Sequence, residues 1–245
     1  MEENFGGITL AHVIQFQTRI LFGAQYGRIE LANKKRSDEQ LIIACLRMGW
    51  NDAFRHVSTN QPSANEDVKN YLKNSNQRYE DYYCSILDNK DFLAIFKKYA
   101  SAKSTDDKCK AIQENWWKIK DVLKIVKVTE KAKENDKPLC FGHIQKMFNI
   151  AVKLYLCVYM CREHLGLDDL PFDQNMLDAL PYADCPIDSV ILGETNKKQY
   201  RDLVWSKIHS PEEITTYKNI QDDFREESKR DGGNSSLYFD FVNWN

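Results

Sequence analysis

The sequence has little glycine and proline, and it has no apolar run long enough to cross a membrane. Glycine occurs 10 times and proline 6 times in 245 residues, which excludes collagen-like and low-complexity chains. The longest apolar stretch, 150–161, is interrupted by Lys153 and is far shorter than the roughly 20 residues of a membrane span. Glu2 and Glu3 stand where a secretory signal carries basic residues. We therefore expect a globular, cytoplasmic protein with no membrane partner.

The sequence also lacks the motifs of several large enzyme classes. It contains no Cys-x-x-Cys and no His-x-x-x-His pair, so zinc sites and metal hydrolysis are without their usual ligands. Gly-rich phosphate loops, dinucleotide turns and nucleophile elbows are absent too. The seven cysteines are scattered, and we interpret them as reduced core thiols. Cys157 and Cys161, one helical turn apart, could share a metal, but the sequence predicts no metal and no cofactor.

Apolar residues recur at helical spacing, and alternating strand patterns of useful length are nearly absent. This periodicity predicts an all-α protein, and two helical subdomains with a cleft between them would be one arrangement of it. The expected helices are about 8–23, 38–56, 64–88, 91–101, 105–128, 142–165, 174–181 and 211–228. We divide the chain into an N-terminal helical region (1–100), a central region (101–209) and a C-terminal helix with its tail (210–245).

Two helix starts carry recognisable capping patterns. Ser37 with Gln40, and Ser210 with Glu213, each place a side-chain acceptor before the helix and a reciprocal group three residues later. Pro211 suits a first helical position, where its missing N–H costs nothing.

The chain after the last helix is unusually aromatic. The helix should end before the glycines at 232–233. The tail 237–244 is too aromatic for a solvated segment, so it is predicted to pack back on the body, with a short strand as one form for it.

Charge is distributed unevenly along the chain. The segment 97–153 contains 14 lysines and no arginine against seven acidic residues, a local charge of +7 in a chain whose net charge is −2. Such an excess indicates a polyanionic partner, because phosphate affinity depends on local lysine density. A solvated lysine-rich helix surface explains the same pattern, since acids alternate among the lysines.

The stretch 137–153 is the most informative. Proline and glycine bracket a short turn, and the helix that follows buries one apolar stripe: Ile144, Met147, Phe148, Ala151, Leu154, Tyr155 and Val158. Lys146 falls just outside that stripe, near the first turn. The positive end of the helix dipole disfavours the charged form of an ammonium there, so Lys146 is a candidate nucleophile.

Asp188 follows Pro186 and Ile187 and precedes a new apolar run. On its own this pattern is typical of the N-cap of a short helix.

Together the two segments resemble the helix-hairpin-helix DNA glycosylase superfamily. Pro138-Leu139-Cys140-Phe141-Gly142 corresponds to the hairpin, Lys146 to the lysine of the bifunctional enzymes, and Pro186-Ile187-Asp188 to the catalytic aspartate segment. The run from Gln145 to Lys153 is most similar to the archaeal 8-oxoguanine DNA glycosylase branch. The chain departs from the family at the hairpin, where Lys137 replaces the usual leucine and the second glycine is missing.

The resemblance implies a helix-hairpin-helix catalytic region over 101–209 and a base-excision reaction. Asp188 would stabilise the positive charge that develops on the sugar. The same carboxylate would accept a proton from Lys146, whose neutral amine would then attack C1′ and form a Schiff base that permits strand cleavage, which makes the enzyme a glycosylase and a lyase. The archaeal branch implies oxidised purines, while a modified pyrimidine or a hypermodified viral base fits the same chemistry.

Such an enzyme extrudes its target nucleotide and needs aromatic faces for the base and basic groups for the backbone. Candidates for the base and its flanks are Phe141, Gly142, His143, Gln145, Phe148, Trp116, Trp117 and Trp205. Aromatic residues at helical spacing are more often core. Trp205 is also placed to staple the last helix, and the two polar candidates could cap a helix.

A second hypothesis explains the charge asymmetry without chemistry. In it the chain is a non-enzymatic helical binding protein, whose lysine-rich face engages a protein or nucleic-acid partner and whose match at Lys146 and Asp188 is accidental. The two hypotheses differ in one respect: only the glycosylase needs these side chains close together in space.

Overall fold

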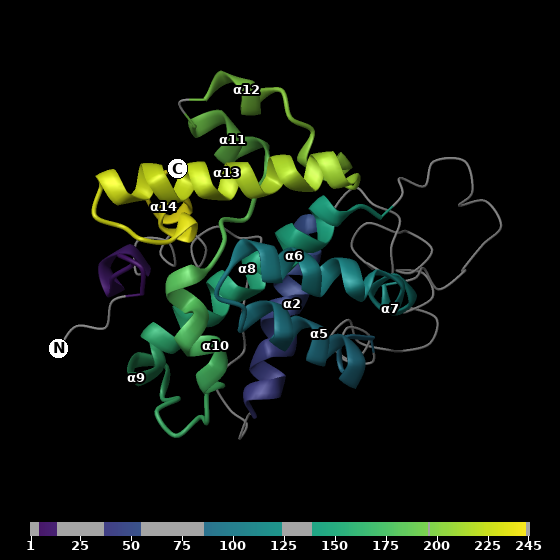
Figure 1. Ribbon diagram of the computed structural model, residues 1–245. Coiled ribbons are helices and arrows are strands. Elements are labelled where there is room, and N and C mark those ends of the chain that lie inside the picture. Colours follow the sequence, from purple (N-terminus) through teal and green to yellow (C-terminus); the bar gives the residue numbers. More distant parts are fainter. Residues whose placement is uncertain (1–4, 14–36, 55–85, 124–138, 196, 244–245) are drawn as a thin grey trace.

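The structure is a computed structural model, and it describes residues 5–13, 37–54, 86–123, 139–195 and 197–243 (Figure 1). Over these ranges the chain is helical, and the extended contacts amount to an isolated bridge between Phe5 and Ile8. The all-α prediction is therefore confirmed. Among the described helices, none combines the length and the apolar character that a membrane span requires.

The elements are, in chain order, α2 (Asp38–Ala53), α5 (Lys90–Ala100), α6 (Thr105–Glu114), α7 (Trp116–Val122), α8 (Phe141–Met160), α9 (Arg162–Leu165), α10 (Gln174–Ala179), the 3₁₀ turn η2 (Leu180–Tyr182), α11 (Ser189–Glu194), α12 (Lys198–Arg201), the 3₁₀ turn η3 (Trp205–Lys207), α13 (Pro211–Arg230) and α14 (Ser236–Asn243).

Helix α8 forms the centre of the molecule (Figure 1). Every residue of the predicted apolar stripe is buried, as expected. The helix is enclosed on its other faces as well, so it also buries the polar side chains of His143, Gln145, Lys146, Asn149 and Lys153. Buried polar groups of this kind need partners inside the protein, and the partners of these five residues shape the candidate site.

Helix α2 lies directly against α8. A Cβ atom added at Gly49 would come within 2.3 Å of the Met147 carbonyl oxygen, so the two backbones touch at this point. Glycine is required there because any side chain would push the helices apart. This close packing brings the end of α2 next to the first turns of α8.

The long helix α13 crosses the molecule above α8 in the view of Figure 1, and α14 packs against α13. The predicted capping boxes are present at the starts of α2 and α13. Helix α13 ends at Arg230, before the two glycines, as predicted. Gly232 has a φ of 87°, a left-handed conformation that favours glycine at a helix end.

Other helices differ from the predicted ranges. The helix expected over 105–128 breaks at Asn115, whose side-chain amide donates to the Ala111 carbonyl oxygen at 3.0 Å and competes with the helical pattern. The helix expected over 174–181 gives way to η2 at Leu180, next to Pro181. The short helix α12 was not predicted, and α11 was anticipated only through the capping pattern at Asp188. Most of 8–23 and 64–88, and the end of 105–128, lie outside the described residues.

The tail packs back on the body as predicted, but the suggestion of a strand is wrong, because 236–243 is the helix α14. Leu237 and Phe241 are buried one helical turn apart, and the Phe239 ring stacks on the Phe224 ring of α13 at 4.4 Å. Packing against α13 therefore outweighs the strand preference of the aromatic residues.

Candidate active site

Lys146 lies between two carboxylates. Its Nζ is 3.2 Å from the Asp188 Oδ2 and 2.7 Å from the Asp52 Oδ2. Lys146 belongs to α8, Asp52 to the last turn of α2, and Asp188 precedes α11. The structure thus brings the amine and the carboxylate of the glycosylase hypothesis into direct contact, and it adds a second acid that the sequence did not single out.

The side chains of this group are mostly enclosed, yet each keeps some exposure to solvent. The exposed fraction of the side chain is 8% for Lys146, 16% for Asp52 and 18% for Asp188. Lys146 is the sixth residue of α8 and so belongs to its second turn. The helix dipole acts mainly within the first turn, so the two carboxylates dominate the electrostatic environment of the ammonium.

Asp188 is also the N-cap of α11. Its Oδ1 accepts hydrogen bonds from the backbone N–H groups of Val190 and Ile191, at 2.9 and 3.0 Å. Its other oxygen, Oδ2, faces Lys146. The capping interpretation is confirmed, and capping fixes the carboxylate in the orientation that meets the amine.

Trp205, in η3, covers the amine from another side. The Lys146 Nζ lies 4.8 Å from the centre of the Trp205 ring, a cation–π distance, and the half-buried ring also meets the His143 ring edge-on at 5.7 Å. These contacts place Trp205 against α8.

Gly142 allows η3 to approach so closely. A Cβ atom there would fall 1.9 Å from the Trp205 carbonyl oxygen, and the Gly142 N–H donates to the Ile208 carbonyl oxygen at 3.0 Å. Gly142 belongs to the first turn of α8, and the residues 137 and 138 of the hairpin pattern lie outside the described part of the chain.

The remaining sequence candidates lie behind the amine. His143 is 3% exposed, stacks on Phe54 at 5.6 Å and accepts a hydrogen bond from the Cys140 N–H through Nδ1. Phe141 is buried against the Tyr217 ring, and Gln145 has no exposed surface. In this arrangement these residues support the site and do not present a surface to a base.

The surroundings of Phe148 and Trp116 also differ from those of an exposed aromatic face on which a base could stack. Phe148 is fully buried among the rings of Phe92, Phe96 and Tyr99. Trp116 is half-buried, with its ring 4.9 Å from the His209 ring. Phe148 is therefore core.

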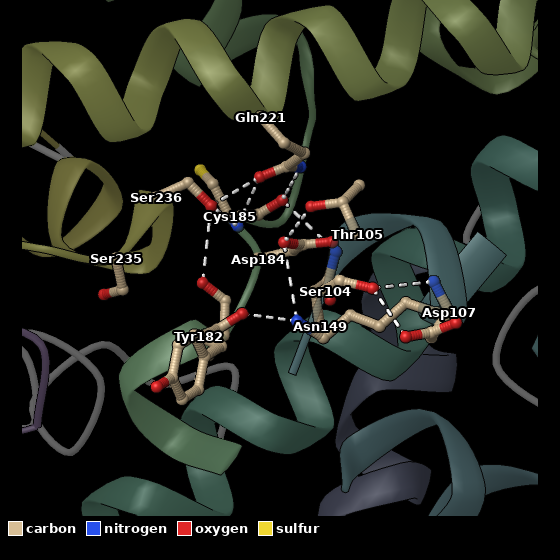
Figure 2. Close-up of polar contacts among 12 residues, drawn as sticks. Ser104, Thr105, Asp107, Asn149, Tyr182, Asp184, Cys185, Gln221, Ser235 and Ser236 are labelled. Atoms are coloured by element: carbon tan, nitrogen blue, oxygen red, sulfur yellow. Dashed lines mark hydrogen bonds and ion pairs between the residues drawn. The ribbon is translucent and has the colours of Figure 1, made fainter. Parts of the chain in front are cut away.

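The extended segment that leads to Asp188 is held by buried side chains from α8 and α13 (Figure 2). The Cys185 carbonyl oxygen accepts from Asn149 and Gln221, and its N–H donates to Gln221. One residue before Asp188, the Ile187 carbonyl oxygen accepts from Gln145 at 3.2 Å. These hydrogen bonds replace those that the backbone would make in a helix or a strand. They therefore fix the position of Asp188.

Asp184, in the same segment, is the centre of a buried polar network (Figure 2). Its Oδ1 accepts from the Thr105 hydroxyl at 2.8 Å and from the Arg225 guanidinium at 3.2 Å, and Lys108 lies 3.5 Å away. Burial lowers the pKa of Lys108, and the charge of Asp184 opposes that change. The network ties α6 and α13 to the segment that carries Asp188.

A second buried ion pair lies two turns along α8 from Lys146. Lys153 forms an ion pair with Asp240 of α14, and both side chains are about 95% enclosed. Burial raises the pKa of Asp240, while Lys153 acts in the opposite direction. The charges of Asp188 and Lys146 also act on Asp240, Asp188 raising its pKa and Lys146 lowering it.

The basic segment 97–153 is only in part a basic surface. The described lysines of this segment that lie against carboxylates are Lys97, Lys98, Lys108, Lys110, Lys146 and Lys153. Lys103, Lys118 and Lys120 are exposed. Trp117 of α7 is 72% exposed, and the Lys120 Nζ lies 5.2 Å from the centre of its ring. Of these exposed groups, Lys118, Lys120 and Trp117 lie on α7.

The structure contains an open pocket whose lining does not include Lys146. It has a volume of about 400 Å³ and is lined by residues of α5 and α10 and the turns beside them: Lys97, Lys98, Ser101, Lys103, Asp173, Asn175 and Asp178. The described cysteines, at positions 45, 109, 140, 157, 161 and 185, are buried thiols that form no disulfide bond. Within the described ranges, no three His, Cys, Asp or Glu side chains are placed to hold a metal ion.

Asp52, Asn149 and Gln221 were not found from the sequence. The available signal was the pair of amides at Gln145 and Asn149, one turn apart on an otherwise apolar helix. Comparison of the chain with known protein families, with curated proteins and with solved structures finds no match.

Proposed function

We propose that the chain is a DNA N-glycosylase with associated lyase activity, in which Lys146 is the nucleophile and Asp188 stabilises the sugar cation. The observation that supports this most directly is the 3.2 Å contact between the Lys146 Nζ and the Asp188 Oδ2. The two residues are remote in the sequence and were paired by the family resemblance alone.

The contact suits the chemistry of base excision. As the bond between the base and C1′ breaks, the base takes the electron pair and positive charge develops on the sugar. A fixed carboxylate beside that sugar lowers the energy of the transition state. The Lys146 amine, once it has lost a proton, forms a bond to C1′. Opening of the sugar ring then gives the Schiff base, with the proton on nitrogen passing to O4′.

Further features support a DNA substrate. Trp205 lies beside the amine as a half-buried aromatic face, and α7 presents Trp117 with exposed lysines. Aromatic faces and lysines are the groups that bind an extruded base and the DNA backbone. The resemblance to the archaeal branch makes an oxidised purine the first substrate to test.

The experiment is base release and borohydride trapping on duplexes that carry 8-oxoguanine, uracil or an abasic site. We expect base release from a modified duplex, and a covalent adduct that Lys146→Gln abolishes. Lys90→Gln, an exposed lysine at the start of α5, is the matched control and should leave the adduct unchanged. An adduct that survives Lys146→Gln would rule out the proposed nucleophile.

A non-enzymatic binding protein remains the second candidate, because Trp117 is so exposed on α7. An exposed tryptophan beside lysines is typical of a surface for a nucleic acid or a protein. This candidate predicts that DNA binding depends on Trp117 and is unchanged by Lys146→Gln, with no base release and no adduct on any of the duplexes. Binding and base release measured on the same samples separate the two candidates.

A further inference from the structure

Asp52 gives Lys146 a second carboxylate partner that nothing in the resemblance assigns. Its Oδ2 is 2.7 Å from the Lys146 Nζ, closer than the 3.2 Å to the Asp188 Oδ2. Asp52 belongs to α2, in the N-terminal part of the chain, outside the segments that carry the resemblance. The distance is that of a charge-assisted hydrogen bond, which is the geometry for direct proton transfer.

The two carboxylates differ in what surrounds them. The Asp188 Oδ1 accepts two backbone hydrogen bonds at the start of α11. Adding a proton to Asp188 would weaken both bonds, so the cap opposes its use as a proton acceptor. Asp52 is the next-to-last residue of α2, a helix of 16 residues. The negative end of that helix disfavours an anion and therefore favours a carboxylate that takes up a proton.

We propose that Asp52 accepts the proton of Lys146, which leaves Asp188 free to stabilise the sugar cation. This division of roles rests on the proposed function. The N–H bond of the ammonium breaks and its proton passes to the Asp52 Oδ2. The electron pair left on Nζ forms the bond to C1′ while the base departs with the pair of the glycosidic bond. Protonated Asp52 then gives its proton to the departing base anion.

An abasic duplex distinguishes the proposed role of Asp52 from that of Asp188. At an abasic site the amine attacks the C1′ aldehyde and water leaves, so no base departs and no sugar cation of base release forms. Attack still requires a neutral amine. Asp52→Asn should therefore slow both base release and borohydride trapping on an abasic duplex. Asp188→Asn should slow base release much more than trapping on the abasic duplex.

The pH dependence of the trapping rate distinguishes proton transfer from a purely structural role of Asp52, because the loss of a structural contact would not change it. With Asp52 present, the trapping rate should be nearly flat across roughly pH 6 to 9, because the proton acceptor is built in. In Asp52→Asn the rate should be lower by at least about tenfold near neutrality and should rise with pH, since solvent hydroxide must take the proton. Glu39→Gln, an exposed acid at the other end of α2, is the control and should follow the wild-type profile.

The outcomes distinguish the two claims. A wild-type chain that neither releases a base nor forms an adduct overturns the proposed function and the Asp52 assignment together. If the wild type is active and the Asp52→Asn profile is flat and within about twofold of the wild-type rate, the assignment of Asp52 as proton acceptor is wrong but the proposed function stands. A rising profile in Asp188→Asn instead would assign the proton transfer to Asp188. Should Asp52→Asn fail to fold by circular dichroism, Asp52→Glu keeps a carboxylate and should retain the flat profile, whereas a rising profile in that variant counts against the assignment.

Discussion

At the scale of single residues, Lys146 depends on groups that three different elements deliver. Asp52 comes with α2, Asp188 with the N-cap of α11, and Trp205 with η3. A buried ammonium is costly unless carboxylates and aromatic faces replace water. Each of these three groups is held by something else: the α2 contact with α8, the capping of α11, and the glycine at position 142. The geometry of the site therefore depends on residues outside it.

Gly142→Ala tests this dependence. The new methyl group would lie 1.9 Å from the Trp205 carbonyl oxygen, which is backbone, so η3 must move away from α8. We expect a loss of about 1 to 3 kcal/mol in the free energy of unfolding, as for other overpacked sites. Urea unfolding measures the loss. Gly193→Ala, where nothing lies within 4 Å of the added Cβ, should change stability far less, and equal losses at both positions would contradict the account.

At the scale of elements, helix ends set the geometry. The start of α13 is closed by a reciprocal pair: the Glu213 N–H donates to the Ser210 Oγ, and the Glu213 Oε2 accepts from the Ser210 and His209 N–H groups at 2.8 and 2.9 Å. These backbone hydrogen bonds lower the pKa of Glu213 below its ordinary value of 4.5. The same chain segment joins η3 to α13, so this cap also holds the turn that carries Trp205.

The cap predicts a pH-dependent stability. Because the pKa of Glu213 is lowered in the folded protein, its contribution is fully present above about pH 4.5 and is lost as the pH falls through the folded value. Glu213→Gln should therefore be less stable than the wild type near neutral pH, and the difference should shrink in acid. Thermal unfolding of both proteins from neutral pH to pH 3 checks this. A difference that stays constant or grows in acid would show that the carboxylate does not act in this way.

At the scale of the whole molecule, buried polar contacts join the C-terminal part of the chain to the central helix. Lys153 of α8 and Asp240 of α14 form one such contact. In another, the Asn149 amide of α8 donates to the Tyr217 hydroxyl of α13 at 3.2 Å. An ion pair that is buried contributes little against well-packed apolar groups, but removing one partner leaves an uncompensated charge. The last helix is thus positioned by a specific pair as well as by its apolar face.

Asp240→Leu should lower the free energy of unfolding by about 3 to 5 kcal/mol, because the Lys153 ammonium loses its carboxylate partner in the interior. The double variant Lys153→Met with Asp240→Leu should recover most of that loss, since no buried charge remains. Guanidinium unfolding of the wild type, both single variants and the double variant completes the cycle. A double variant as unstable as Asp240→Leu would mean that shape, and not charge, dominates at this contact.

The sequence predicted helices with their own local signals and missed features that depend on distant partners. The buried stripe of α8 and the caps at Ser37 and Ser210 follow from spacing within one segment. The helical form of the tail does not, because Phe239 and Asp240 find their partners on α13 and α8. In the site, a family resemblance paired Lys146 with Asp188. Asp52 carries no local signal, because an acid near the end of a helix is ordinary until the packing of α2 on α8 places it beside an amine.

The most direct test of the central claim is to locate the covalent bond to DNA. An abasic duplex is treated with the wild-type chain and borohydride, the adduct is digested, and mass spectrometry identifies the modified residue. Our account predicts a reduced adduct on the Lys146 Nζ, and none with an unmodified duplex. An adduct on any other amine, or no adduct at all on the abasic duplex, would contradict the account.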